Sequence, residues 1–301
     1  MIRRLCLGLL CGALSLPTLT GCGGRQELLT QDINAVKKGD AQPLVDEAMG
    51  HWAKRGDKAE LQKSIDAFKK AADMDPTRAD VQVMLARAYY SMSNLHLRWE
   101  DDSKDAQKAS FDKGVIAAET AIKLTSPEFA AKIKAGESWN DAIPSVTSPK
   151  GLEAMYWYSS NLGKWMVMEG IATALKYKDR VSALMTHCKK LDEKFFYGGP
   201  HRYFGAYWAK VPFSSDLNKS KMHFEKSIEL APEYLETKVY MAREWATRVD
   251  EDEGGGIEVF KKLLKEVVDA DANALSADLV PENQNAQRQA KGMIEDAEDF
   301  F

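Results

Sequence analysis

Aromatic and basic side chains crowd the stretch of residues 195–212, which reads FFYGGPHRYFGAYWAKVP. The Gly-Gly-Pro at 198–200 favours the end of one helix and the start of another, because glycine tolerates positive backbone angles and proline suits a first helical position. His201 and Arg202 would then lie in a first turn, where the helix dipole disfavours a cation. We therefore expect Arg202 to have an anionic partner, either an internal carboxylate or an acidic group of a ligand or partner protein.

A second group of unusual side chains follows Pro149. Trp157, Asn161 and Trp165 are spaced by four residues, so they share one face of a predicted helix. Buried tryptophan and asparagine both need hydrogen-bond partners. Two readings stay open: a packed core with a satisfied asparagine, or the aromatic wall of a ligand cavity with Asn161 as its polar group.

Motifs of covalent or metal chemistry are missing from the sequence. It contains no nucleophile elbow, phosphate-binding loop, HExxH or Cys-x-x-Cys motif. The five histidines have no metal-like spacing, and the neighbours His187 and Cys188 would not face each other on a helix. We expect no catalytic residue, no metal site and no cofactor, although a hydrolase or metal enzyme assembled from distant residues stays an alternative.

The N-terminus has the parts of a bacterial export signal. Arg3 and Arg4 precede a short apolar run that is too short to span a membrane. Residues 19–22, Leu-Thr-Gly-Cys, resemble a lipobox, so residues 1–21 are predicted to be a lipoprotein signal peptide and Cys22 the lipidated cysteine. An ordinary secretory signal is the alternative. Because no Asp follows Cys22, we expect an anchor in the outer membrane, with the protein facing the periplasm.

Composition narrows the possible partners of the mature chain. Cys188 is the one cysteine left beyond Cys22, so no disulfide framework is expected. Without Arg3 and Arg4, 39 basic residues face 45 acidic ones, a net charge of about −6. No basic cluster is evident, so nucleic acid is not an expected partner.

The elements that must position these residues are helices, because strand signals are nearly absent. KSIDAFKKAADMDP at 63–76 has a counterpart in KSKMHFEKSIELAP at 219–232, with a small residue, an aromatic, a small residue and a proline at equal spacing. This is the tetratricopeptide (TPR) pattern. The match continues from Val83, Leu85, Ala86 and Tyr89 to Val239, Met241, Ala242 and Trp245, and Gly114, Ala118, Ala121 and Pro127 form a weaker third copy.

The predicted fold class is therefore all-α, a TPR-like helical-repeat (α-solenoid) domain with interrupted repeats. We expect residues 22–39 to form a lipid-anchored tether and the start of the first helix, and residues 40–301 to form a single TPR-like domain. Residues 134–149 are predicted to be a long loop. Residues 250–256, DEDEGGG, are predicted to break the chain before a helix at 257–268.

Several elements together resemble the TatT component family, lipoproteins associated with tripartite ATP-independent periplasmic (TRAP) transporters. They are YWY at 156–158, NLG at 161–163 with Trp165, GGPHR at 198–202 with Gly205, and DL at 216–217. HFE at 223–225, KV at 238–239 and PEN at 281–283 complete the resemblance, which covers roughly residues 40–297. It implies a periplasmic protein with TPR-like hairpins, a cleft or pore through each protomer, and a homotrimer.

The resemblance also implies docking of the transporter's solute-binding protein and handling of a small apolar or carboxylate ligand. In this hypothesis Trp157, Trp165, Tyr203 and Tyr207 supply apolar contact, while Asn161, His201 and Arg202 orient a polar or carboxylate end. The alternative is a scaffold lipoprotein that assembles envelope complexes and presents a peptide-binding groove. Pro281-Glu282-Asn283 is expected to cap the last helix, with ligand or pore contact as the second reading.

Overall fold

The computed structural model describes residues 28–31 and 36–301, and this part of the chain is all-helical with no strand. The predicted all-α class is confirmed. Cys22 and the signal peptide lie outside the described residues. The α-helices are α1 (Gln42–Trp52), α2 (Lys58–Met74), α3 (Ala79–Ser91), α4 (Lys104–Thr125), α5 (Pro127–Lys134), α6 (Trp139–Ala142), α7 (Pro149–Glu169), α8 (Ile171–Leu191), α9 (Phe195–Lys210), α10 (Leu217–Leu230), α11 (Glu236–Glu244), α12 (Gly256–Asp269), α13 (Ala272–Leu275) and α14 (Val280–Glu295).

Consecutive helices form antiparallel hairpins, and matching serines make matching contacts in two of them. Ser64 on α2 donates a hydrogen bond to the carbonyl of Ala48 on α1 (2.9 Å). Ser220, its counterpart on α10, donates to the carbonyl of Gly205 on α9 (2.7 Å). Small side chains at these positions allow the paired helices to approach closely and satisfy the hydroxyl in an apolar interface. The two corresponding serines therefore make the same kind of contact with the preceding helix.

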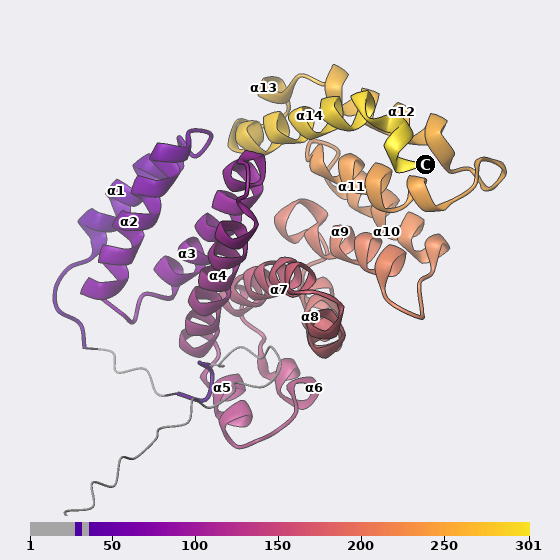
Figure 1. The fold of residues 1–301 in the computed structure, drawn as a ribbon. Coiled ribbons are helices and arrows are strands. Elements are labelled where there is room, and N and C mark those ends of the chain that lie inside the picture. Colours follow the sequence, from indigo (N-terminus) through magenta and orange to yellow (C-terminus); the bar gives the residue numbers. More distant parts are fainter. Residues whose placement is uncertain (1–27, 32–35) are drawn as a thin grey trace, which may run out of the picture.

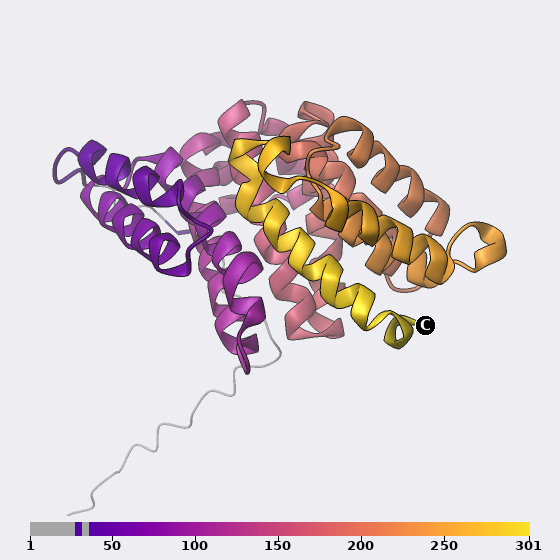
Figure 2. The same cartoon turned by 90° about the horizontal axis from the view of Figure 1, so that it is seen from above.

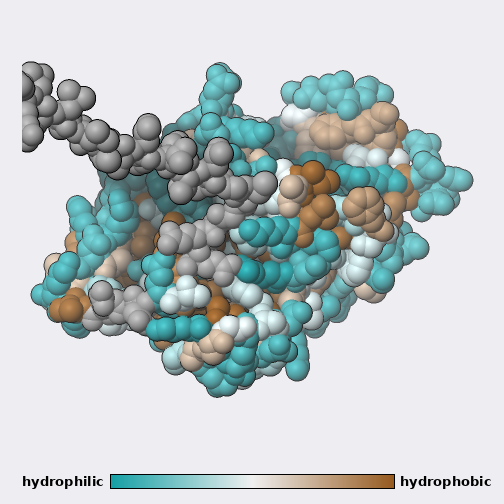
Figure 3. Space-filling model, turned by 60° about the horizontal axis from the view of Figure 1, so that its bottom comes forward, coloured by the Kyte–Doolittle hydropathy of each residue, from teal (hydrophilic) through white to brown (hydrophobic). Residues whose placement is uncertain are grey.

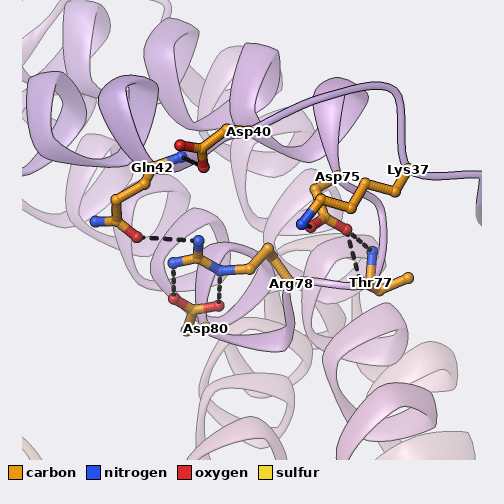
Figure 4. Close-up of polar contacts among 7 residues, drawn as sticks. All are labelled: Lys37, Asp40, Gln42, Asp75, Thr77, Arg78 and Asp80. Atoms are coloured by element: carbon orange, nitrogen blue, oxygen red, sulfur yellow. Dashed lines mark hydrogen bonds and ion pairs between the residues drawn. The ribbon is translucent and has the colours of Figure 1, made fainter.

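Polar contacts fix the chain where it enters the first hairpin (Figure 4). Lys37 forms an ion pair with Asp75, at the C-terminal end of α2 (3.1 Å), and Asp75 also accepts a hydrogen bond from the Thr77 hydroxyl (2.6 Å). Arg78, next to Thr77, donates to the side chain of Gln42 at the first residue of α1 (3.1 Å). Among the described residues the first helix begins at Gln42.

The helices follow one another around a closed circuit. In Figure 1, the α1–α2 hairpin lies at one side and α14 runs across the top, from the upper end of α3 and α4 toward α11 and α12. Figure 2 shows α14 lying across the molecule in front of these helices. α14 contacts α11, α12 and the π-helical turn Met92–His96 that extends α3. The C-terminal helix thereby returns to the N-terminal part of the chain.

Two large apolar cores lie along this circuit, and a small third cluster contains Ala231, Tyr234 and Leu279. The larger one joins α1–α5 to α7–α9 and includes fully buried Phe68, Phe129 and Tyr158. The smaller one joins α10, α11, α12 and α14 around Phe224 and Phe260. Polar side chains join the two large cores where α14 and α11 meet the turn after α1 and the π-helical turn after α3.

Two predicted breaks in the helical pattern differ in outcome. Residues 134–149 are not a continuous loop, because α6 and a 3₁₀ turn at Ile143–Ser145 occupy residues 139–145 in their middle. The break at residues 250–256 is confirmed: a 3₁₀ turn spans Glu251–Glu253, Gly254 is left-handed, and α12 then begins at Gly256.

The outer surface is mixed in polarity. On the face drawn in Figure 3, hydrophobic residues form small groups separated by hydrophilic ones. The largest exposed apolar side chains include Val167 and Ile171 at the turn between α7 and α8, and Phe213 after α9. No helix in residues 28–31 and 36–301 is both long enough and apolar enough to cross a membrane.

Candidate functional site

A left-handed turn interrupts α9 at its first residues. Phe196, Tyr197 and Gly198 have φ values of 45°, 57° and 66°. The predicted break is therefore present, but two of its three left-handed residues are aromatic. Gly199 is not left-handed and instead allows Tyr156 to approach closely. A Cβ atom on Gly199 would lie 2.3 Å from the Tyr156 hydroxyl oxygen. Left-handed backbone at bulky residues is unfavourable and needs support from its surroundings.

Arg202 supplies that support. Its guanidinium is buried and donates hydrogen bonds to the carbonyls of Tyr197 (2.9 Å) and Phe196 (3.3 Å). It also donates to the hydroxyls of Tyr156 (3.3 Å) and Thr237 (3.4 Å). No carboxylate of the described residues forms an ion pair with Arg202. The internal carboxylate considered from the sequence is thus replaced by backbone carbonyls and hydroxyls, which leaves a positive charge inside the protein.

Around this turn lies a group of touching aromatic and cationic side chains from four segments, here called the aromatic–cation cluster. The Trp157 ring lies 4.7 Å from the Phe196 ring, and the Arg202 guanidinium lies 4.2 Å from the centroid of Tyr234. Such contacts favour a cation against a ring face. The cluster consists of Arg87 on α3, Tyr156 and Trp157 on α7, Phe196 and Arg202 on α9, and Tyr234 before α11.

The tyrosines of the cluster stay neutral. Burial raises the pKa of Tyr156 and raises the pKa of Tyr234 well above its ordinary value. Their hydroxyls are therefore polar groups without charge. The Tyr234 hydroxyl donates a hydrogen bond to the Glu236 carboxylate (2.8 Å). Burial acts to raise the pKa of Glu236, but the Lys164 charge and the hydrogen bond from Asn94 lower it overall. Glu236 is consequently an ionised, fully engaged carboxylate next to the cluster.

Asn161 and Trp165 continue along the α7 face that carries Trp157, as predicted. Asn161 is completely buried, and its amide donates to the carbonyls of Ala86 (3.1 Å) and Trp157 (2.8 Å). A Cβ atom on Gly114 would lie 2.2 Å from the Asn161 side-chain oxygen, so α4 crosses α7 very closely here. Trp165 packs edge-on against Tyr177 of α8. The Asn161 NH2 group is therefore satisfied within the protein, whereas its side-chain oxygen is buried without a hydrogen-bond partner.

The remaining predicted site residues of α9 point away from Arg202. His201 contacts His223 of α10, with the two Nδ1 atoms 2.9 Å apart, and its Nε2 lies 3.2 Å from Glu193. Tyr203 stacks on Tyr207 with ring centroids 5.7 Å apart. The Tyr203 hydroxyl is buried without a hydrogen-bond partner. The structure thus joins Trp157 to Arg202, and it places His201 and the two tyrosines in separate groups.

Arg87 is a member of the cluster that the sequence analysis did not select. Its guanidinium lies 4.9, 5.2 and 5.7 Å from the ring centroids of Trp52, Phe196 and Trp157. Its position in the apolar run VQVMLARAYY could have identified it, because burying a charge on an apolar helix face is costly unless the charge has a partner or a function.

The PEN element closes the circuit beside the cluster. Pro281 lies in the first turn of α14, as expected for a helix start, and Glu282 is buried against Arg55. Asn283 accepts from the Leu235 amide (3.1 Å) and donates to the Glu233 carbonyl (2.9 Å), which holds the segment that carries Tyr234. These residues fix the position of the cluster.

Nothing in the described part of the chain has the arrangement of a metal centre, since no group of three or more His, Cys, Asp or Glu side chains could hold an ion. Burial raises the pKa of the Cys188 thiol to about 12. This thiol is therefore a poor nucleophile at neutral pH.

Comparison with known families decides the relationship of the chain. The family model described as TAtT, TRAP transporter T-component, matches residues 71–301. The chain belongs to this family. The resemblance carried by GGPHR and PEN is thereby confirmed, and membership in the T-component family supports an accessory role at a TRAP transporter, on its periplasmic side. The family is a transporter component and not an enzyme family. A comparison with curated proteins found no match.

Proposed function

We propose that this T-component is a periplasmic accessory lipoprotein that binds the solute-binding protein of a TRAP transporter and handles a small organic ligand. The observation that carries the proposal is the family match over residues 71–301. The aromatic–cation cluster supports the ligand, because apolar rings around a buried cation are suited to a carboxylate on an apolar body. No covalent step is required, so the protein is proposed not to be an enzyme.

The proposed ligand contacts from the sequence have unequal structural support. Trp157 and Arg202 both belong to the cluster, where Trp157 supplies an apolar ring and Arg202, whose donors are bound to protein carbonyls and hydroxyls, positions Phe196. Tyr203, with its unpartnered hydroxyl, and Tyr207 form a second aromatic pair that offers a polar group. The other three are buried and have neighbouring protein groups as contacts, which favours a packing role: Asn161, Trp165 and His201. The Asn161 side-chain oxygen is the one polar atom among them that is buried without a hydrogen-bond partner.

Membrane attachment is proposed to occur through lipid on Cys22, with an outer-membrane address. The support is the Leu-Thr-Gly-Cys sequence and the glycines that follow it. Several acyl chains on one residue would give stable anchoring. Cells labelled with radioactive palmitate should incorporate label into the wild-type chain and not into Cys22→Ser. Label retained in the serine variant would reject this anchor.

We further propose that the hairpins are TPR-like repeats and that the protein is a homotrimer. The paired serine contacts of Ser64 and Ser220 support the repeats. The trimer rests on the family resemblance. The competing proposal is a scaffold that assembles envelope complexes through a peptide groove. The closed circuit and the charged aromatic interior favour a ligand-handling protein over an open groove.

The proposal is tested by native mass spectrometry of the mature domain, prepared with Cys22→Ser, alone and mixed with solute-binding proteins of TRAP transporters from the same organism. A trimer that captures one receptor per protomer is expected. A chain that captures no such receptor would reject the accessory role. A phosphate- or sugar-binding receptor from an unrelated transporter class is the matched control, and it should not be captured.

A further inference from the structure

Arg87 is an arginine without a polar partner. None of its nitrogens makes a hydrogen bond or an ion pair with another described residue, and its Nε atom is buried with no partner. The side chain as a whole is only partly buried, so its outer nitrogens are reachable from solvent. A guanidinium has five N–H donors, and leaving the buried one at Nε unpaired is costly. Arg87 therefore has the capacity for a strong acceptor that the protein does not provide.

Comparison of the two sequence copies shows that the missing partner is particular to Arg87. In the alignment that pairs Val83 with Val239 and Ala86 with Ala242, Arg87 corresponds to Arg243. Arg243 donates from Nε to the neighbouring Glu244 (2.9 Å), and the residue that corresponds to Glu244 in the first copy is Ala88. The second copy thus carries its own carboxylate for the arginine, and the first copy does not.

Neighbouring carboxylates are engaged elsewhere or too far away. Glu282 attracts Arg87 electrostatically, but both of its oxygens accept hydrogen bonds from Arg55. Glu153 on α7 lies near enough for the Arg87 charge to lower its pKa, yet burial raises that pKa overall and the two groups form no ion pair. Burial in turn lowers the pKa of Arg87. The charge of Arg87 is therefore incompletely compensated.

We propose that Arg87 binds the carboxylate of a small organic acid whose apolar body packs against the surrounding rings. A planar guanidinium pairs with a carboxylate through two parallel hydrogen bonds. Of the rings around it, Phe196 is partly exposed, while Trp52 and Trp157 are buried and give the site its apolar walls. Arg202 donates a hydrogen bond to the backbone of Phe196, so it positions this ring and does not itself contact the ligand. This inference rests on the proposed ligand handling and names its substrate class.

The test uses ¹⁹F NMR titration of the Cys22→Ser domain with 4-fluorophenylacetate and its neutral analogue 4-fluorophenylacetamide. Wild type should bind the acid at least tenfold more tightly than the amide. Arg87→Gln should lose this preference, with the acid bound at least tenfold more weakly. Equal affinity of wild type for acid and amide, failure to bind the acid, or unchanged acid affinity in Arg87→Gln would each overturn the proposal.

Arg180→Gln is the matched control, because Arg180 is also partly buried and stacks on a tryptophan, with its guanidinium 4.1 Å from the Trp139 centroid. This variant should bind the acid like wild type. Arg87→Lys keeps the charge but loses the paired hydrogen bonds, so it should still prefer the acid with severalfold weaker affinity. It also keeps the test decisive if Arg87→Gln does not fold, since loss of the acid preference in a folded Arg87→Lys would reject the charge contact.

Receptor capture separates this proposal from the proposed function. Folded Arg87→Gln should still capture the solute-binding protein in native mass spectrometry, because Arg87 faces the interior cluster. If wild type captures no receptor but prefers the acid, the accessory role fails and the Arg87 site stands. If wild type captures a receptor but shows no acid preference, the Arg87 site fails and the accessory role stands.

Discussion

Arg55 and Glu282, 227 residues apart in the sequence, form a buried two-point ion pair between the turn that joins α1 to α2 and the start of α14. Arg55 Nε lies 2.9 Å from one carboxylate oxygen and Nη2 lies 2.7 Å from the other. Asn94 on the π-helical turn donates to Glu236 of α11 (2.9 Å), and Trp99 donates to Asn285 of α14 (2.9 Å). These contacts join the N-terminal and C-terminal helices into one circuit.

Glu282→Gln is therefore expected to lower the free energy of unfolding by about 3 kcal/mol, because it leaves the buried Arg55 charge without its counterion. Chemical denaturation of the two proteins measures the difference. Asp269→Asn breaks the exposed pair with Lys265 on α12 and should change stability by no more than about 0.5 kcal/mol. Equal effects of the two variants would show that the buried pair does not hold the circuit closed.

Close approach of α9 and α10 depends on Gly205. A Cβ atom there would lie 2.6 Å from ring carbons of Phe224. Gly205→Ala should destabilise the protein by about 1–3 kcal/mol through overpacking. Gly292→Ala on α14 is the control, since a Cβ atom there meets nothing within 4 Å, and it should stabilise by about 0.5–1 kcal/mol. Thermal unfolding of both variants shows whether each one raises or lowers the stability. A stabilising Gly205→Ala would contradict the close packing of α9 on α10.

Acid should destabilise the contact between His201 and His223. Burial lowers the pKa of His223 to about 4, with Lys189 and His201 adding to the effect. In the unfolded chain this group has its ordinary pKa of 6.5, so between pH 6.5 and 4 the unfolded state binds more protons than the folded one. Stability is then fully present above about pH 6.5 and falls as the pH drops toward 4.

The measurement is the midpoint of thermal unfolding from pH 7.5 to 4.5, compared between wild type and His223→Asn. One imidazole Nδ1 must donate to the other, so protonating both places two cations 2.9 Å apart. Glu193 and Lys226 also act on His201, with opposite signs. The wild-type midpoint should fall more steeply with acid than that of the variant. Parallel curves would show that this pair does not titrate in the expected range.

Arg202→Gln tests whether the left-handed turn needs the guanidinium. Glutamine cannot reach both carbonyls of Phe196 and Tyr197, so the variant should lose about 2–4 kcal/mol of stability and the fixed position of the Phe196 ring. Near-ultraviolet circular dichroism reports the aromatic packing. Trp157→Ala removes a neighbouring ring and should weaken ligand binding in the folded state. Unchanged ligand binding in folded variants at both positions would reject these two residues as parts of the site.

Local patterns in the sequence were sufficient for much of the fold. Helical periodicity predicted the all-α class, and the spacing around Ser64 and Ser220 identified two helices whose serines bond the preceding helix in the same way. The left-handed turn includes Gly198, as expected, but extends to Phe196 and Tyr197 in place of Gly199, because Arg202 supports the backbone and Tyr156 approaches Gly199 closely. Helix propensity and glycine positions are local properties, so they cannot predict a turn that is stabilised by contacts from distant residues.

The candidate site was harder to predict, since its members come from four segments. The sequence pointed to Arg202 as the ligand contact, but its donors are bound within the protein, and the unpartnered arginine is Arg87. Which arginine has free donors depends on long-range positions: Glu282 is bound by Arg55, and Ala88 stands where the second repeat has Glu244. Only the three-dimensional structure reveals that relation.

The central claim, that this chain serves a TRAP transporter, is tested most directly by uptake in intact cells. Cells lacking the chain but retaining the transporter's receptor and membrane components should take up less of the labelled transporter substrate than wild-type cells. Expression of the full-length chain should restore the rate of uptake. An unchanged rate in cells that lack the chain, at substrate concentrations below saturation, would contradict the account.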